Sequence, residues 1–138
     1  MTWRRAALVS ILLLGACADF PRDTDGTLER SAAGDLRAGV VADPRAGPEE
    51  RRLTRALLAA MPDGRPVEGA GEPLLLALER GDLDIVVGRF DKRTPWATRV
   101  TFTKPMLTRG ELELKAATRN GEHAWAMRVE RAAAALSR

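Results

Sequence analysis

A run of basic side chains follows one strongly apolar segment of the chain. The segment "LDIVV" (83–87) is β-branched and apolar on both faces, which predicts a buried strand. Between residues 89 and 109 there is one acid, Asp91, against six basic residues: Arg89, Lys92, Arg93, Arg99, Lys104 and Arg109. Because open α/β sheets bind ligands at the carboxyl ends of their strands, Arg89, Arg93 and Arg99 form a candidate anion site. The alternative is a solvated charged rim, or arginines that face lipid phosphates or a protein partner.

The sequence holds few residues that could act as catalytic groups or metal ligands. His123 is the only histidine and Cys17 the only cysteine, so a Ser-His-Asp or Cys-His arrangement would have to include His123. That residue falls in the first turn of a predicted helix, where a surface position is expected. The acids Glu49-Glu50, Asp82 and Asp84 are explained by helix N-terminal charge and by turns, and they lack a signature of acid–base pairing. We therefore expect no enzyme activity, no cofactor and no metal site.

The N-terminus has the order of a secretory signal peptide. Residues 1–16 hold a basic head (Arg4 and Arg5), an apolar stretch from residue 6 to residue 14, and small residues after it. The apolar stretch is far shorter than the roughly 20 residues that a membrane-spanning helix needs. A buried N-terminal helix is the alternative, but the polar "ADFPRDTDG" that follows offers no cap or partner face.

The end of this segment, "LLGAC", resembles the lipobox of bacterial lipoproteins, with Leu14, Gly15 and Ala16 before Cys17. In that family the cysteine is acylated and becomes the first residue of the mature protein. The resemblance implies that Cys17 anchors the chain to a membrane of the bacterial cell envelope, inner or outer, on the periplasmic side. Residues 17–26 would then be the lipidated cysteine and its tether, and residues 27–138 a single domain.

The charge of the mature chain gives no argument for nucleic acid. Residues 1–16 hold two Arg and no acid, so their removal lowers the formal charge from +3 to +1. No predicted helix carries a basic stripe interleaved with aromatic residues, which nucleic-acid binding would favour.

The remaining chain alternates apolar runs with helical patterns. Strands are predicted over 36–41, 65–70, 83–87 and 111–118, and helices over 27–34, 48–61, 73–80 and 122–138. This alternation predicts an α/β lobe in three layers, with a mostly parallel sheet of about four strands and helices on both faces. The last strand alternates apolar and charged residues, which predicts one buried face, and its direction is left open. The predicted core comprises Leu36, Val40, Leu53, Leu57, Leu75, Leu78, Ile85, Val87, Leu112, Leu114, Trp125 and Val129.

The segment "ALERGDLDIVVGRFDKRTPWATRVTFTKPM" resembles the central signature of bacterial extracellular solute-binding proteins of family 3, the receptors of ABC importers. The matching residues are Gly81, Asp84, Ile85, Val86, Val87, Thr94, Phe102, Thr103 and Pro105, with Met106 in place of the usual aromatic. Full members trap a ligand between two lobes, whereas only about thirty residues follow "FTKPM" here. With this resemblance we expect one lobe alone, with strand order 2-1-3-4.

The resemblance also implies where a ligand would bind. Amino-acid-binding members place an arginine in the loop after the third strand, and the corresponding residue here is Trp96. Trp96 could suit a different ligand or could cover the end of the sheet. The candidate ligand-binding residues are Arg89, Thr94, Trp96 and Arg99.

Two functions therefore compete on sequence grounds. The first is a membrane-anchored lobe that binds a small polar or anionic solute weakly, for an ABC permease or a sensor protein. The second is a structural or interaction lipoprotein of the cell envelope without a small-molecule ligand.

Overall fold

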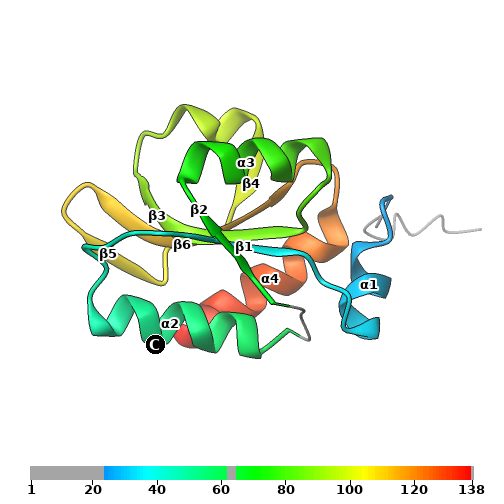
Figure 1. Cartoon of the computed structure of the whole chain (residues 1–138), viewed down its shortest axis with the longest axis horizontal. Coiled ribbons are helices and arrows are strands. Elements are labelled where there is room, and N and C mark those ends of the chain that lie inside the picture. The colour runs from blue at the N-terminus through cyan, green and yellow to red at the C-terminus, as the bar shows by residue number, and fades with distance from the viewer. Residues whose placement is uncertain (1–23, 62–64, 138) are drawn as a thin grey trace, which may run out of the picture.

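The computed structural model describes residues 24–61 and 65–137 as one three-layer α/β lobe (Figure 1). The strands are β1 (Ala38–Val41), β2 (Val67–Gly69), β3 (Ile85–Asp91), β4 (Val100–Phe102), β5 (Leu107–Arg109) and β6 (Leu112–Arg119). The α-helices are α1 (Thr27–Ala33), α2 (Pro48–Ala59), α3 (Gly71–Arg80) and α4 (His123–Leu136), and a short 3-10 helix, η1, covers Pro95–Thr98. The predicted signal peptide and Cys17 lie outside the described residues.

The sheet has the order β2-β1-β3-β6-β4, with β5 also paired to β6. β1 runs parallel to β2 and β3, while β6 runs antiparallel to β3, β4 and β5. The predicted strand order 2-1-3-4 is confirmed, with β6 as the fourth strand. The direction of that strand, which the sequence left open, is antiparallel to β3. The short strands β4 and β5 were not predicted, because three-residue strands carry too little periodicity to be recognised.

Local sequence signals set the ends of the helices. Pro48 occupies the first turn of α2, where its missing N–H costs nothing, and the Glu50 carboxylate accepts a hydrogen bond from the Gly47 N–H before the helix. Gly34 and Gly81 end α1 and α3 with φ of 77° and 89°, a conformation that favours glycine. α3 begins at Gly71, two residues before the predicted start.

Two hydrophobic clusters lie on the two faces of the sheet. α2 and α4 pack on one face, over Ile85, Val87 and Leu114, and α3 packs on the other, over Val86 and Phe90. Helices on both faces were predicted, and the three-layer architecture confirms them.

The predicted core requires two corrections. Leu112 is 39% exposed because it lies beside the turn at Gly110, at the tip of the β5–β6 hairpin, and Val40 is only partly buried.

The predicted one-sided burial of the last strand is also wrong, since β6 is buried on both faces. Lys115 is 6% exposed, with its Nζ 2.8 Å from Glu113 and 4.7 Å from the centre of the Phe102 ring.

Candidate functional site

A pocket of about 550 Å³ opens at the carboxyl ends of β1 and β3. In the sheet, β1 lies between β2 and β3. The connection from β1 leads to β2 on one side, and the chain then crosses to β3 on the other side, so the connections diverge at the boundary between β1 and β3. Open α/β sheets bind ligands at such a point. The pocket floor is apolar and includes Val40, Val87 and Leu114 from the sheet and Leu58 from α2.

A chain of ion pairs fixes the charged side of this pocket. The Arg89 side chain, 12% exposed, donates from Nε to Asp43 Oδ2 at 2.8 Å and from Nη1 to Glu50 Oε1 at 3.4 Å. Arg109 extends this network of ion pairs, with its Nε 3.6 Å from Glu50 Oε1 and its Nη2 2.8 Å from Glu49 Oε2. Burial alone would raise the pKa of Asp43, but the hydrogen bond from Arg89 and the backbone N–H of Arg45 lower it. The charge of Arg89 is therefore balanced by carboxylates of this chain.

Polar side chains without such partners line the pocket rim. Thr54 and Arg55 come from α2 and Glu68 from β2. Within residues 24–61 and 65–137, neither Arg55 nor Glu68 takes part in an ion pair, and both are exposed. Arg51, which also lines the pocket, is likewise exposed and has no ion pair among these residues. The described part of the pocket thus offers two unpaired arginines and one unpaired acid above an apolar floor.

The other three predicted site residues lie together on the opposite face of the sheet. Thr94 caps η1, and its Oγ1 accepts a hydrogen bond from the Trp96 N–H at 3.4 Å. The Arg99 guanidinium stacks 4.2 Å from the centre of the Trp96 ring, and its Nε donates to Glu79 Oε1 of α3 at 3.0 Å. Hydrogen bonding to Glu79 raises the pKa of Arg99. Trp96 is half-buried and packs against the α3-side cluster.

The structure thus separates Arg89 from Thr94, Trp96 and Arg99. Arg89 projects to the α2 face of β3, since it alternates with Phe90 of the α3-side cluster. Arg89 pairs with Asp43 on the α2 face of the sheet, and Arg99 pairs with Glu79 on the α3 face. The arginines at 89, 93 and 99 therefore do not form a single anion site. A ligand-binding role for any of these residues stays a prediction.

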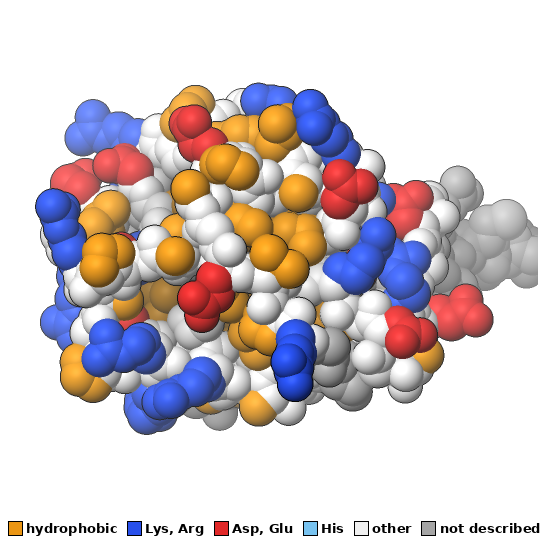
Figure 2. Space-filling view, in the orientation of Figure 1, with side chains coloured by type: hydrophobic (Ala, Val, Ile, Leu, Met, Phe, Trp, Pro, Cys, Tyr) orange, Lys and Arg blue, Asp and Glu red, His pale blue; other side chains and the backbone are white. Residues whose placement is uncertain are grey.

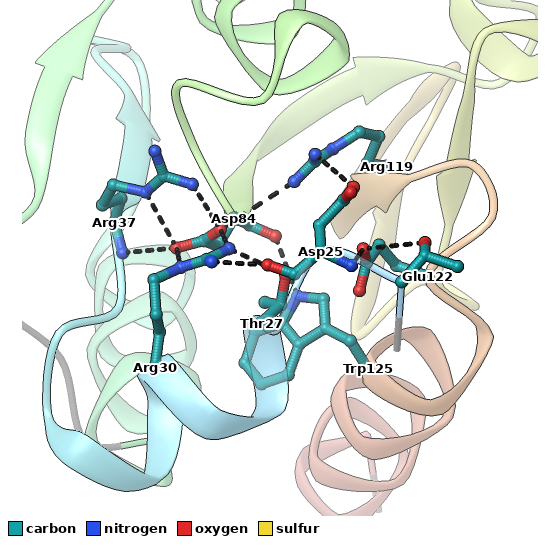
Figure 3. Close-up of polar contacts among 9 residues, drawn as sticks. Asp25, Thr27, Arg30, Arg37, Asp84, Arg119, Glu122 and Trp125 are labelled. Carbon is teal, nitrogen blue, oxygen red and sulfur yellow. Dashed lines mark hydrogen bonds and ion pairs between the residues drawn. The ribbon is translucent and has the colours of Figure 1, made fainter. Parts of the chain in front are cut away.

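A second polar cluster, which the sequence did not predict, lies at the opposite end of β3 (Figure 3). The fully buried Asp84 carboxylate accepts hydrogen bonds from Arg30 Nη2 at 2.6 Å, from Arg37 Nη2 at 2.9 Å and from the Arg37 backbone N–H at 3.0 Å. Arg119 Nη2 lies 4.0 Å from the same carboxylate, and Trp125 Nε1 donates to the Asp84 carbonyl at 2.8 Å. This cluster joins α1, β1, β3, β6 and α4.

Electrostatics in this cluster favour the charged carboxylate. Burial alone would raise the pKa of Asp84, but the hydrogen bonds from Arg37 and Arg30 outweigh it and lower the pKa to about 2. Asp84 lies in the turn before β3 as interpreted, but turn chemistry does not account for its carboxylate, which is held in this buried cluster. No local pattern marks this cluster, since its arginines lie 54, 47 and 35 residues from Asp84 in the sequence.

The described residues hold neither a cluster of metal ligands nor a helix that could span a membrane. Among residues 24–61 and 65–137, no three His, Cys, Asp or Glu side chains lie close enough together to hold a metal ion. In that part of the chain, no helix has the length and apolar character needed to cross a membrane.

Comparison with known proteins identifies the fold. No protein-family model and no curated protein matches the chain. Among solved structures, the arginine-bound form of domain 1 from TmArgBP is 16% identical with a TM-score of 0.62, and the match covers 78% of this chain and 98% of that one. A phenylalanine-to-tryptophan variant of the same domain, also with arginine bound, is 15% identical with a TM-score of 0.63, covering 80% and 97%. At these identities the likeness establishes the fold, a single α/β lobe similar to a solute-binding protein domain.

Proposed function

We propose that this chain is a membrane-anchored solute-binding lobe that takes a small solute in the pocket at the carboxyl ends of β1 and β3. One observation carries the proposal: the pocket lies where the connections of the parallel strands diverge, the position at which open α/β sheets bind ligands. The similar structures support it, because they are binding-protein domains and not enzymes, and both hold arginine. An ABC permease or a sensor protein would be the partner of such a lobe.

The lining of the pocket narrows the kind of solute. Its apolar floor suits an aliphatic or aromatic body, and Arg55 and Glu68 on the rim offer opposite charges. Since Arg89 is balanced by Asp43 and Glu50, a simple anion gains little there. We therefore propose a zwitterionic solute with an apolar portion, an amino acid in particular, and arginine is the first to test.

Binding should be weak, because a single lobe leaves half of the solute in water, where charged contacts are screened. We expect a Kd for L-arginine or another amino acid on the order of 0.1–1 mM, about −4 to −5.5 kcal/mol. Arg55→Ala should weaken binding about tenfold by removing one charge-assisted contact. Arg52→Ala, an exposed arginine on the same helix that does not line the pocket, is the matched control and should leave Kd unchanged.

Calorimetric titration of residues 18–138 against an amino-acid panel measures these constants. This piece keeps both hydrophobic clusters whole. Submicromolar binding by a monomer would contradict the single-lobe argument. If the double variant Trp96→Ala/Arg99→Ala abolished binding while Arg55→Ala did not, the solute would bind on the α3 face instead.

The anchor is proposed from the sequence motif at Cys17. In cells fed a labelled fatty-acid analogue, we expect the wild-type chain to carry label and Cys17→Ala to carry none, since acylation requires the thiol. Ser31→Ala is a suitable control, because Ser31 lies in α1, remote from the motif in sequence. Equal labelling of wild type and Cys17→Ala would contradict the anchor and leave the solute pocket unaffected.

The competing function is an interaction lipoprotein without a solute. It is favoured by the internal ion pairs of Arg89 and Arg99, and by exposed apolar side chains at Val67 (56%) and Met127 (46%). A solute panel that gives no binding, with a partner captured through β2 or α4, would support it.

A further inference from the structure

The outer surface of the layer formed by α2 and α4 is basic. α2 exposes Arg51, Arg52 and Arg55, and α4 exposes Arg128 and Arg131. In the view of Figure 2, Lys and Arg side chains gather along the lower margin, where α2 lies in Figure 1. α2 and α4 pack side by side on the same face of the sheet. Arg51 and Arg55 also line the pocket beside β1 and β2, whereas Arg131 lies near Phe102 of β4.

The acids of these two helices do not balance the five arginines. Glu49 and Glu50 of α2 already pair with arginines of the sheet, and Glu50 is buried. Glu130 of α4 accepts a hydrogen bond from the uncharged Lys104 backbone N–H at 3.0 Å, so its charge offsets only one of the five arginines. Among the described residues, none of the five arginines forms an ion pair. α3, on the other face of the sheet, carries Glu72, Glu79 and Arg80, and its Glu79 is paired with Arg99.

The described chain begins beside the same layer. The Asp25 N–H donates to Glu122 Oε1 at 2.8 Å, and Glu122 directly precedes α4. α1 lies against α4 (Figure 1). Only seven peptide steps separate Cys17 from Thr24, a span of at most roughly 25 Å. An acylated Cys17 would therefore hold the α4 side of the lobe close to the membrane.

We propose that the basic surface of α2 and α4 docks on anionic phospholipid headgroups. Arg52, Arg128 and Arg131, which lie outside the solute pocket, supply planar guanidinium groups that pair with phosphate oxygens through two hydrogen bonds at once. An anionic bilayer surface attracts clustered arginines within about 8 Å at physiological salt. Docking would orient the lobe, with the α2–α4 layer toward the bilayer and α3 away from it.

Vesicle flotation of residues 18–138 tests this surface without any contribution from an acyl chain. The test variant is the triple Arg52→Gln/Arg128→Gln/Arg131→Gln, since none of these residues lines the solute pocket. The control triple is Arg65→Gln/Arg80→Gln/Arg93→Gln, which removes the same charge from exposed arginines outside α2 and α4. Each protein is mixed with vesicles of phosphatidylcholine alone, or with one third phosphatidylglycerol, at low and high sodium chloride.

We expect the wild type to float only with the phosphatidylglycerol vesicles and to be released by high salt. The test triple should bind those vesicles about tenfold more weakly or worse, and the control triple close to wild type. Equal loss in both triples, equal binding to neutral vesicles, or binding to a DNA duplex without binding to vesicles would each overturn the proposal. Amino-acid binding by the test triple should match wild type, so failure here is distinguishable from failure of the solute pocket.

Discussion

Replacing Asp84 with alanine is expected to lower the free energy of unfolding by about 2–4 kcal/mol. The substitution removes the acceptor for Arg30 and Arg37 and leaves Arg119 without the carboxylate 4.0 Å away. The expected loss is below that of a wholly buried ion pair, because the Arg30 and Arg37 side chains are 31% and 42% exposed and can be hydrated. Urea unfolding followed by tryptophan fluorescence measures the change.

Asp82→Ala is the matched control for this substitution. Asp82 is exposed, two residues away, and outside the cluster, so its removal should change the free energy of unfolding by less than about 0.5 kcal/mol. Similar losses for the two variants would contradict the role assigned to the cluster.

The lowered pKa of Asp84 also predicts how stability depends on pH. Its folded pKa of about 2 lies below the ordinary 3.8, so the unfolded chain takes up the proton first as pH falls. The stabilisation from this group is fully present above pH 4 and is lost as pH falls toward 2, in all about 2 kcal/mol. Asp84→Asn should be less stable at pH 6, and its deficit against wild type should shrink between pH 4 and pH 2.

Replacing Ile85 with alanine is expected to cost about 2–5 kcal/mol of unfolding free energy. Ile85 is fully buried in the central strand β3, within the cluster formed with α2 and α4, so the change leaves a cavity that the flanking strands cannot close. Thermal and urea unfolding of the purified variant would measure the loss.

Leu112→Ala provides the comparison, because the sequence predicted both residues to be in the core. Leu112 is 39% exposed, and its truncation should cost at most about 1 kcal/mol. If Leu112→Ala cost as much as Ile85→Ala, the exposed position of the β5–β6 hairpin tip would be wrong.

The alternation of strands and helices could be predicted from the sequence because it depends on neighbours in the chain. The apolar run at Ile85, the proline at Pro48 and the glycine at Gly81 act within a few residues, and they marked β3, the start of α2 and the end of α3. The right-handed crossover rule for parallel strands limits how such units can be ordered. The fold class and the order of the four main strands followed from these signals and from the family resemblance.

The partners of charged side chains depended on tertiary structure. Arg89 and Arg99 follow one strand in the sequence, yet the two-residue alternation of β3 and the turn at η1 place them on opposite faces, against Asp43 and Glu79. The alternating pattern of residues 111–118 predicts an exposed Lys115. In the structure, β4 pairs with β6 and its Phe102 ring lies against the Lys115 ammonium group.

What the sequence determined by itself is the local layout of this protein: one lobe, its main strands and helices, and apolar residues such as Ile85 and Trp125 that are fully buried. What only the tertiary structure decided is which charges are free. The Asp84 carboxylate is paired with arginines up to 54 residues away in the sequence, whereas Arg55 and Glu68 line an open pocket. The physical reason is that hydrophobic periodicity is set by each element's own repeat, while an ion pair forms wherever the register of the sheet and the packing of the layers bring two charges within about 4 Å.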